Sequence, residues 1–240
     1  MKHPFHSNIL PLFPMGLGGL GLALRIWLFS ATDGKGLLPA GHFADYALYV
    51  LTAAALGILF LATRKLTPRR ISREFFRLSG AFAYALGGAG LILTAVLCLC
   101  AGSVRLAVVG AIACALGGVL MFGMAALKFF RKRVSYLLHA ALTVVLMLDT
   151  VAQCQVWGAE PQLQAYFFPL LASVFLILSA YQVTALAAGK GKPKLLAFFS
   201  QSAVFLCCLS LNTVQWPLYF GMLFWAAVQL YPCIRMRKEV

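Results

Sequence analysis

Eight apolar runs, each long enough to cross a lipid bilayer, limit what this sequence can fold into. A membrane-spanning helix needs about 20 apolar residues, and such a helix satisfies its own backbone hydrogen bonds inside hydrocarbon. The sequence therefore predicts an all-α fold, a polytopic bundle of eight transmembrane helices that forms a single domain over residues 1–240. The predicted helices cover approximately residues 9–30, 44–63, 79–101, 106–127, 136–157, 166–188, 196–213 and 215–233.

The composition is typical of an integral membrane protein. It is 62% hydrophobic and 11% charged, whereas soluble proteins average about 25% charged residues. The formal net charge is +14. The basic residues lie in short clusters between the apolar runs and not on one folded face, which is typical of membrane orientation signals. We therefore expect a lipid bilayer, and no nucleic acid, as the partner of this basic chain.

The basic clusters also predict an orientation, because Lys and Arg in short loops favour the cytoplasmic side. With the N-terminus inside, only Lys35 and Arg105 fall in outer loops. Both termini are then cytoplasmic, and such compact loops suit a bacterial plasma membrane. The inner clusters lie at residues 64–77, 128–133, 190–194 and 235–238.

Two features of this topology rest on few residues. The turn between the last two runs is marked only by the segment from Asn212 to Pro217, and without it the chain would have seven spans and an outer C-terminus. An internal parallel repeat of residues 1–133 and 134–240 is a second prediction. It rests on matches such as Leu51 with Leu171, which two leucine-rich helices also produce by chance.

Small and basic residues predict contacts with other helices and with lipid. Glycines at helical spacing in the runs 9–30, 79–101 and 106–127 predict that these three helices pack against one another. The basic residues of the longest inner loop either bind anionic lipids or only set the orientation of the chain in the membrane. A partner membrane subunit or a second copy of the chain is a further expectation. The loop arginines are Arg69, Arg70, Arg73 and Arg77.

Catalytic and metal-binding patterns are missing from the sequence. It contains no H-E-x-x-H, G-x-S-x-G or P-loop motif, and no run holds two carboxylates. The 7 cysteines form no C-x-x-C pair, so we expect small buried hydrophobes in place of a zinc site or a disulfide framework. The sequence predicts no enzyme, no cofactor and no metal.

The run Tyr136–Trp157 carries the one deep carboxylate, Asp149. An ionised carboxylate inside a membrane costs several kcal/mol, about 3 or more, so it marks a site and calls for a partner. Gln153 shares its helix face. Asp149 lies roughly 12 Å and Arg25 roughly 8 Å below the outer ends of their runs, so the two side chains are predicted to pair. Alternatively, Arg25 snorkels to the headgroups and Asp149 is protonated and hydrogen-bonded in a dry bundle.

His139 lies on the same run, near its inner end. Ten residues separate it from Asp149, roughly 15 Å along a helix, so the two cannot form one acid–base pair. His139 is either a proton relay or a hydrogen-bonded structural residue.

Two classes of function fit these residues. The first is a small-solute carrier whose polar cavity, for ligand binding or gating, is lined mainly from the second half of the chain. The second is a non-catalytic accessory or scaffold subunit, in which the same polar groups satisfy one another inside a dry bundle. A lipid-modifying enzyme with a lateral opening near His139 or Asp149 is a more distant third. The carrier residues are Arg25, Asp149, Gln153, Gln182, Gln201 and Asn212.

The orientation is testable with fusion proteins. A reporter that matures only in the cytoplasm is expected to be active when fused after Val240, and a reporter that works only outside is expected to be inactive there. The same pair fused before Met1 is the control. The reverse pattern at the C-terminus alone would mean an odd number of spans.

Overall fold

The computed structural model describes most of the chain, and all statements about the structure concern this part. The loop arginines considered for lipid binding, Arg69, Arg70, Arg73 and Arg77, lie outside it, as do the basic C-terminal residues. The described residues are 12–31, 42–64, 79–100, 105–130, 132, 134–157 and 164–234.

Eight α-helices and one short 3₁₀ helix form within the described residues, and each predicted span corresponds to one α-helix. Seven of the helices have the length and apolarity to cross a membrane, and a shorter apolar stretch begins at Trp216 in the eighth. The predicted all-α membrane bundle is confirmed. The elements are α1 (Leu12–Ser30), α2 (Phe43–Arg64), α3 (Ser79–Cys100), α4 (Arg105–Phe129), α5 (Tyr136–Trp157), α6 (Gln164–Ala187), α7 (Pro193–Leu209), η2 (Ser210–Asn212) and α8 (Trp216–Ile234).

The helix ends follow local chemistry. Helix α7 begins at Pro193, earlier than predicted, because proline has a preset φ and needs no hydrogen-bond donor in the first turn of a helix. At its other end, α7 tightens into the 3₁₀ turn η2, and α8 begins at Trp216. The turn between Asn212 and Pro217 is therefore real, and it separates two helices.

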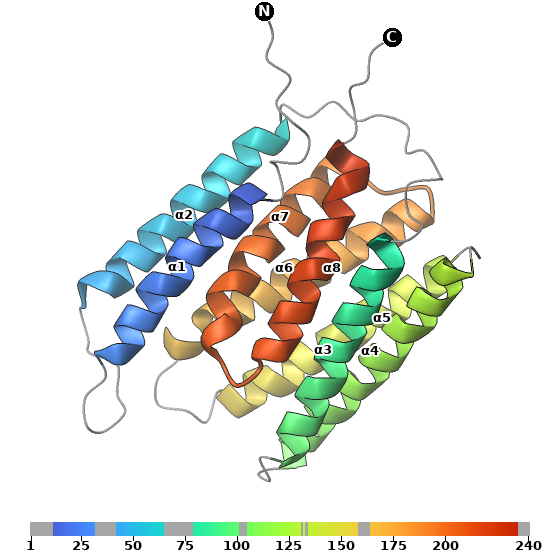
Figure 1. Cartoon of the computed structure of the whole chain (residues 1–240), viewed down its shortest axis with the longest axis horizontal. Helices are drawn as coiled ribbons and strands as arrows, with labels where there is room; N and C mark the ends of the chain where they lie inside the picture. The colour runs from blue at the N-terminus through green and yellow to red at the C-terminus, as the bar shows by residue number, and fades with distance from the viewer. Residues whose placement is uncertain are drawn as a thin grey trace, which may run out of the picture.

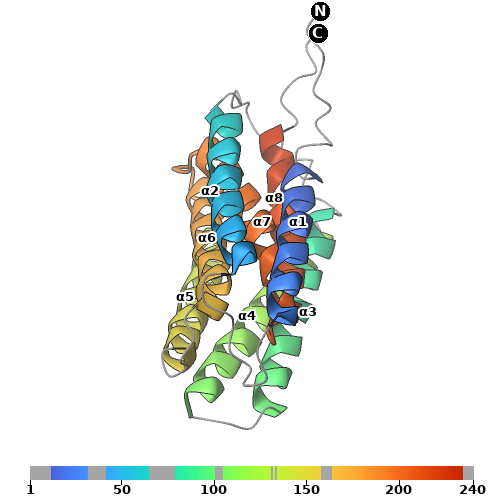
Figure 2. The ribbon, with the colours of Figure 1, turned by 90° about the vertical axis from the view of Figure 1, so that its left-hand side faces the viewer.

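Six helices pack in a closed ring, in the order α3, α4, α5, α6, α7, α8 and back to α3. Helix α1 lies outside the ring against α7, with α2 beside both (Figure 1). Consecutive helices run in opposite directions (Figure 2). We name the end of the bundle where α1, α3, α5 and α7 begin the proximal end, and the other the distal end.

The two halves of the chain pack differently. Helices α6 and α7 share a large interface, whereas α2 and α3, their counterparts in the first half, share no comparable one among the described residues. The internal repeat stays a prediction, since packing alone does not test a duplication of sequence.

Glycines set the closest helix contacts, but not all in the predicted combination. Helices α3 and α4 pack tightly where Gly88 faces the backbone oxygen of Gly118. Helix α1 does not join them. Its Gly18 faces Cys208, and its Gly21 faces Leu209, so α1 packs on α7. The expectation that the three glycine-rich helices form one group was wrong for α1, because its small face fits a helix of the second half.

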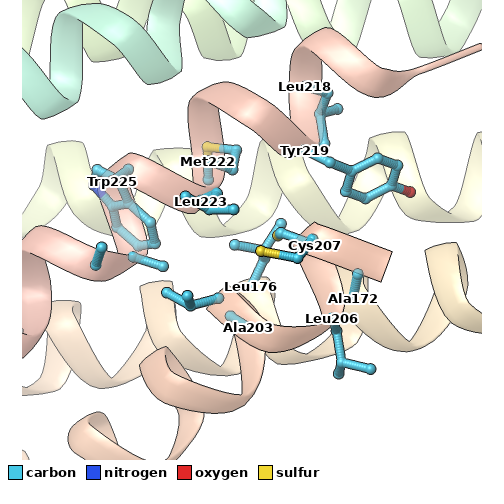
Figure 3. Packing of buried hydrophobic residues seen from close by; sticks show 14 of the residues in the cluster. Ala172, Leu176, Ala203, Leu206, Cys207, Leu218, Tyr219, Met222, Leu223 and Trp225 are labelled. Carbon is cyan, nitrogen blue, oxygen red and sulfur yellow. The ribbon is translucent and has the colours of Figure 1, made fainter. Parts of the chain in front are cut away.

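The interior of the ring is filled by large side chains. Met222 and Trp225 of α8 lie over Cys207 of α7 and Leu176 of α6 (Figure 3). Trp225 is fully buried, so it packs between helices and not against lipid. Gly87 of α3 faces the sulfur atoms of both Met121 and Met222, which brings three helices together at one level. At this level, α3, α4 and α8 meet through an apolar layer.

A glycine substitution tests the α3–α8 contact. A Cβ atom at Gly221 would lie 2.6 Å from the backbone oxygen of Leu86 and 3.1 Å from Cα of Gly87. Since neither atom belongs to a flexible side chain, Gly221→Ala is expected to destabilise the fold by about 1–3 kcal/mol. A Cβ at Gly123 meets nothing within 4 Å, so Gly123→Ala is the matched control and should be neutral or stabilising by up to about 1 kcal/mol. Equal thermal stability of the two variants in detergent would contradict the packing.

Candidate functional site

Asp149 lies on α5 and is 4% exposed. Gln153 follows one turn later on the same face, and its Nε2 donates to Asp149 Oδ2 at 2.6 Å. This bond confirms the shared helix face that their spacing predicted. The bond holds the carboxylate along the buried face of α5 that also carries Gln153.

A glycine and a cysteine of α4 make room for this carboxylate. A Cβ at Gly110 would lie 3.6 Å from Asp149 Oδ1. One turn further along α4, the Cys114 thiol donates to Oδ1 at 3.2 Å. Both donors to Asp149 in the described part of the chain are therefore neutral, and the carboxylate has no basic partner there.

Arg25 is also buried, with 2% of its surface exposed. Its Nη1 donates to the backbone oxygen of Leu209 at 2.7 Å. The guanidinium carbon lies 5.5 Å from the ring centroid of Phe29 and 5.7 Å from that of Phe168. Carbonyls in the last turn of a helix lack intrahelical partners and carry partial negative charge. Arg25 therefore caps the C-terminal end of α7.

The structure separates the predicted pair of Arg25 and Asp149. Helix α1 packs on α2 and α7, whereas α5 packs on α4 and α6, and the two side chains have different hydrogen-bond partners. Arg25 does not snorkel either, because it is buried. Both alternatives for Arg25 were wrong for one reason: the end of α7 offers an acceptor inside the bundle, which the sequence does not reveal.

A second polar cluster lies near the proximal end. Tyr84 of α3 is fully buried, and its hydroxyl lies 3.0 Å from Nε2 of His139. Nδ1 of His139 lies 3.1 Å from the backbone oxygen of Ser135. Because a carbonyl only accepts, Nδ1 carries a hydrogen, and in the neutral ring Tyr84 then donates to Nε2. Gln229 of α8 donates in turn to the Tyr84 oxygen at 3.4 Å.

Further side chains enclose this Tyr84–His139 cluster. The Lys128 ammonium of α4 lies 4.1 Å from the centroid of the Tyr84 ring, a cation–π distance. Trp225 meets the same ring edge to face at 6.1 Å between centroids. His139 thus has two hydrogen-bond partners inside the bundle, which fits the structural interpretation. Its role as a proton relay stays a prediction.

The other predicted site residues do not gather around Asp149. Gln182 lies near the proximal end of α6, where its Oε1 accepts from the backbone nitrogen of Lys192 at 3.5 Å. Asn212 is exposed in η2 at the distal end. The length of α7, 17 residues or roughly 25 Å, separates these two ends. These residues therefore do not line the single cavity that the sequence predicted.

Gln201 of α7 differs from the rest. It is 1% exposed, and neither its Oε1 nor its Nε2 has a hydrogen-bond partner. The Oε1 of Gln153 is likewise buried without a partner. Leaving such a group unpaired costs about 1–3 kcal/mol. A third such amide is that of Gln215 in the turn before α8, whose Oε1 has no partner, and other buried polar atoms without a partner belong to Thr94, Ser202 and Trp225. The amides of Gln153 and Gln201 are therefore among the exceptions to internal satisfaction, and each is equipped to bind something further.

Sequence reasoning missed several members of both clusters. Tyr84 lies in a glycine-rich run that indicated packing alone, and Lys128 looked like an orientation charge. Cys114 looked like a small hydrophobe. A usable signal was the spacing of Gly110, Cys114 and Gly117, which places all three on one face of a helix. That face is the one that meets α5.

No protein-family model matches the chain, and neither a curated protein nor a solved structure does. The described residues also contain no group of three or more His, Cys, Asp or Glu side chains that could hold a metal ion. The chemistry of the site is accordingly argued from its own side chains.

A charge swap tests the separate roles of Arg25 and Asp149. The double variant Arg25→Asp with Asp149→Arg is expected to yield no more folded protein than the worse single variant. The first substitution would place a carboxylate against the Leu209 oxygen, and the second would leave a guanidinium among neutral groups only. Arg25→Lys, which keeps a donor, is the milder control. Recovery of the double variant toward wild type, measured by size-exclusion chromatography in detergent, would instead support a direct pair.

Proposed function

We propose that this protein is a small-solute carrier of a plasma membrane, with its polar site at Asp149 and Gln153 in the distal half of the helix ring. The buried amides without partners carry this proposal. In a scaffold subunit, unsatisfied polar groups would only lower the stability of the fold, and a bilayer supplies none of the missing hydrogen-bond partners. A carrier needs such groups, because they bind solute or water during transport.

The buried carboxylate supports the same conclusion. Asp149 is held by two neutral donors, and no salt bridge cancels its charge among the residues that the structure describes. A deep carboxylate in a membrane protein is costly to keep and is commonly part of an ion or substrate path. A permanently paired structural group would be expected to have a cation beside it.

The arrangement of polar and apolar layers also suits a carrier. The Tyr84–His139 cluster lies toward the proximal end and Asp149 toward the distal end. Between them lie the buried methionines Met121 and Met222. Methionine side chains are flexible and repack readily. Rearrangement of this apolar layer would connect each polar cluster to its own side of the membrane in turn.

The membrane and orientation belong to the proposal. Because the basic clusters favour the cytoplasm, the proximal end is assigned to the cytoplasmic side of a bacterial plasma membrane. The Tyr84–His139 cluster then lies near the cytoplasm, and Asp149 lies nearer the outside.

Cysteine accessibility tests the carrier function. In a background without the 7 native cysteines, Asp149→Cys, Gln153→Cys and Gln201→Cys are expected to react with a membrane-impermeant thiol reagent. Val151 is 56% exposed on the outer surface of α5, so Val151→Cys lies in lipid and should stay unlabelled. The exposed Asn212→Cys is the positive control.

Labelling is measured separately from each side, in right-side-out and inside-out vesicles. Reaction of the buried positions shows that water reaches them in a minor conformation of the carrier. Failure of both 149 and 153 to react from either side, with Asn212→Cys labelled, would overturn the carrier proposal.

A further inference from the structure

Charge balance at Asp149 determines which ion its site takes. Asp149 is 4% exposed, and its two hydrogen-bond donors are an amide and a thiol. An ionised carboxylate buried without a counter-charge is strongly disfavoured. No cation contacts Asp149 in the described part of the chain, so binding a proton stabilises the buried group. We propose that Asp149 takes up and releases a proton, and that a proton is the coupling ion of this carrier; the coupling rests on the proposed carrier function.

The partners of Asp149 are compatible with both protonation states. Gln153 Nε2 donates to Oδ2 at 2.6 Å whether the group is a carboxylate or an acid. The thiol of Cys114 donates to Oδ1 when Asp149 is ionised. When Oδ1 carries the proton, its O–H donates to the sulfur, which is a weak acceptor. The step is a simple addition: one proton from water forms one O–H bond, and no electron moves.

The surroundings of Oδ1 favour a proton over a metal cation. Hard cations such as Ca²⁺ and Mg²⁺ take about six oxygen ligands. The Cys114 sulfur lies 3.2 Å from Oδ1, and a soft sulfur atom is a poor ligand for such an ion. The unpartnered Oε1 of Gln153 is the one further oxygen that belongs to this pair of residues. A proton needs only the carboxylate itself.

The other ionisable groups around Asp149 do not supply the missing positive charge. Besides Cys114 of α4, the ionisable groups near it are Cys98 of α3 and Tyr219 of α8, and neither is a cation. The Arg25 guanidinium also lies near Tyr219, but it donates to the Leu209 oxygen and not to Asp149. Helix α6 also packs on α5, and its ionisable side chains, Tyr166 and Tyr181, are not cations. His139 lies about 15 Å away along α5.

Infrared difference spectroscopy tests the proposal on the full-length protein in lipid vesicles. Spectra in acidic minus alkaline buffer are expected to show the carbonyl stretch of a buried protonated carboxylic acid. Asp149→Asn should remove this band. Asp45, the other described carboxylate, lies in the first turn of α2 and is the matched control, so Asp45→Asn should keep the band. Gln153→Leu should move the band to higher frequency, because it removes a hydrogen bond to Oδ2.

The outcomes separate the ion from the carrier function. A titrating band that Gln153→Leu shifts supports the proposal even if Asp149→Asn fails to fold. A wild-type spectrum without such a band overturns it, and so does a band that sodium removes at constant pH while choline does not, since sodium is then the ion. Cysteine labelling at Gln153 without a titrating band leaves a carrier that is not proton-coupled. If the band titrates but the cysteine variants are not labelled, Asp149 binds a proton without coupling it to transport, and the coupling proposal is overturned.

Discussion

Hydrocarbon offers no hydrogen-bond partner, and the positions of the polar side chains in this bundle follow from that constraint. Arg25 illustrates it most directly. Its guanidinium lies inside the protein, where the backbone oxygen of Leu209 at the end of α7 accepts its hydrogen bond. The guanidinium supplies a hydrogen-bond donor to the end of α7, and the end of α7 supplies an acceptor to the guanidinium. This contact joins α1 to the ring of six helices, and the two aromatic rings beside it keep the charge away from lipid.

The same constraint organises the interior of the ring at Tyr84. Its hydroxyl and ring meet side chains from α4, α5 and α8. A buried tyrosine must bond its hydroxyl while it fills a large apolar space. One residue of the glycine-rich α3 therefore fixes the relative positions of three other helices. The residues that meet it are His139, Lys128, Gln229 and Trp225.

Close packing and the polar site depend on each other. Glycines let the helices of the first half approach each other at backbone distance. On α4 the same glycine pattern continues to Gly110, where the missing side chain leaves space for the Asp149 carboxylate. A bundle packed by larger residues would have pushed this carboxylate toward lipid. The stripe of small residues on α4 thus has two effects, since it brings α3 and α5 close and it shelters an acid between them.

The sequence by itself determined the architecture. Run length sets the helices, and the medium forbids any other arrangement of their backbones, so the eight helices and nearly all their described ends could be predicted. It also indicated Asp149 with Gln153, because their spacing is a property of one helix. Helix neighbours were decided only by tertiary structure. Any apolar face can meet any other in a bilayer, so nothing local shows that Arg25 meets the end of α7, that Cys114 faces Asp149, or that Tyr84 joins four helices.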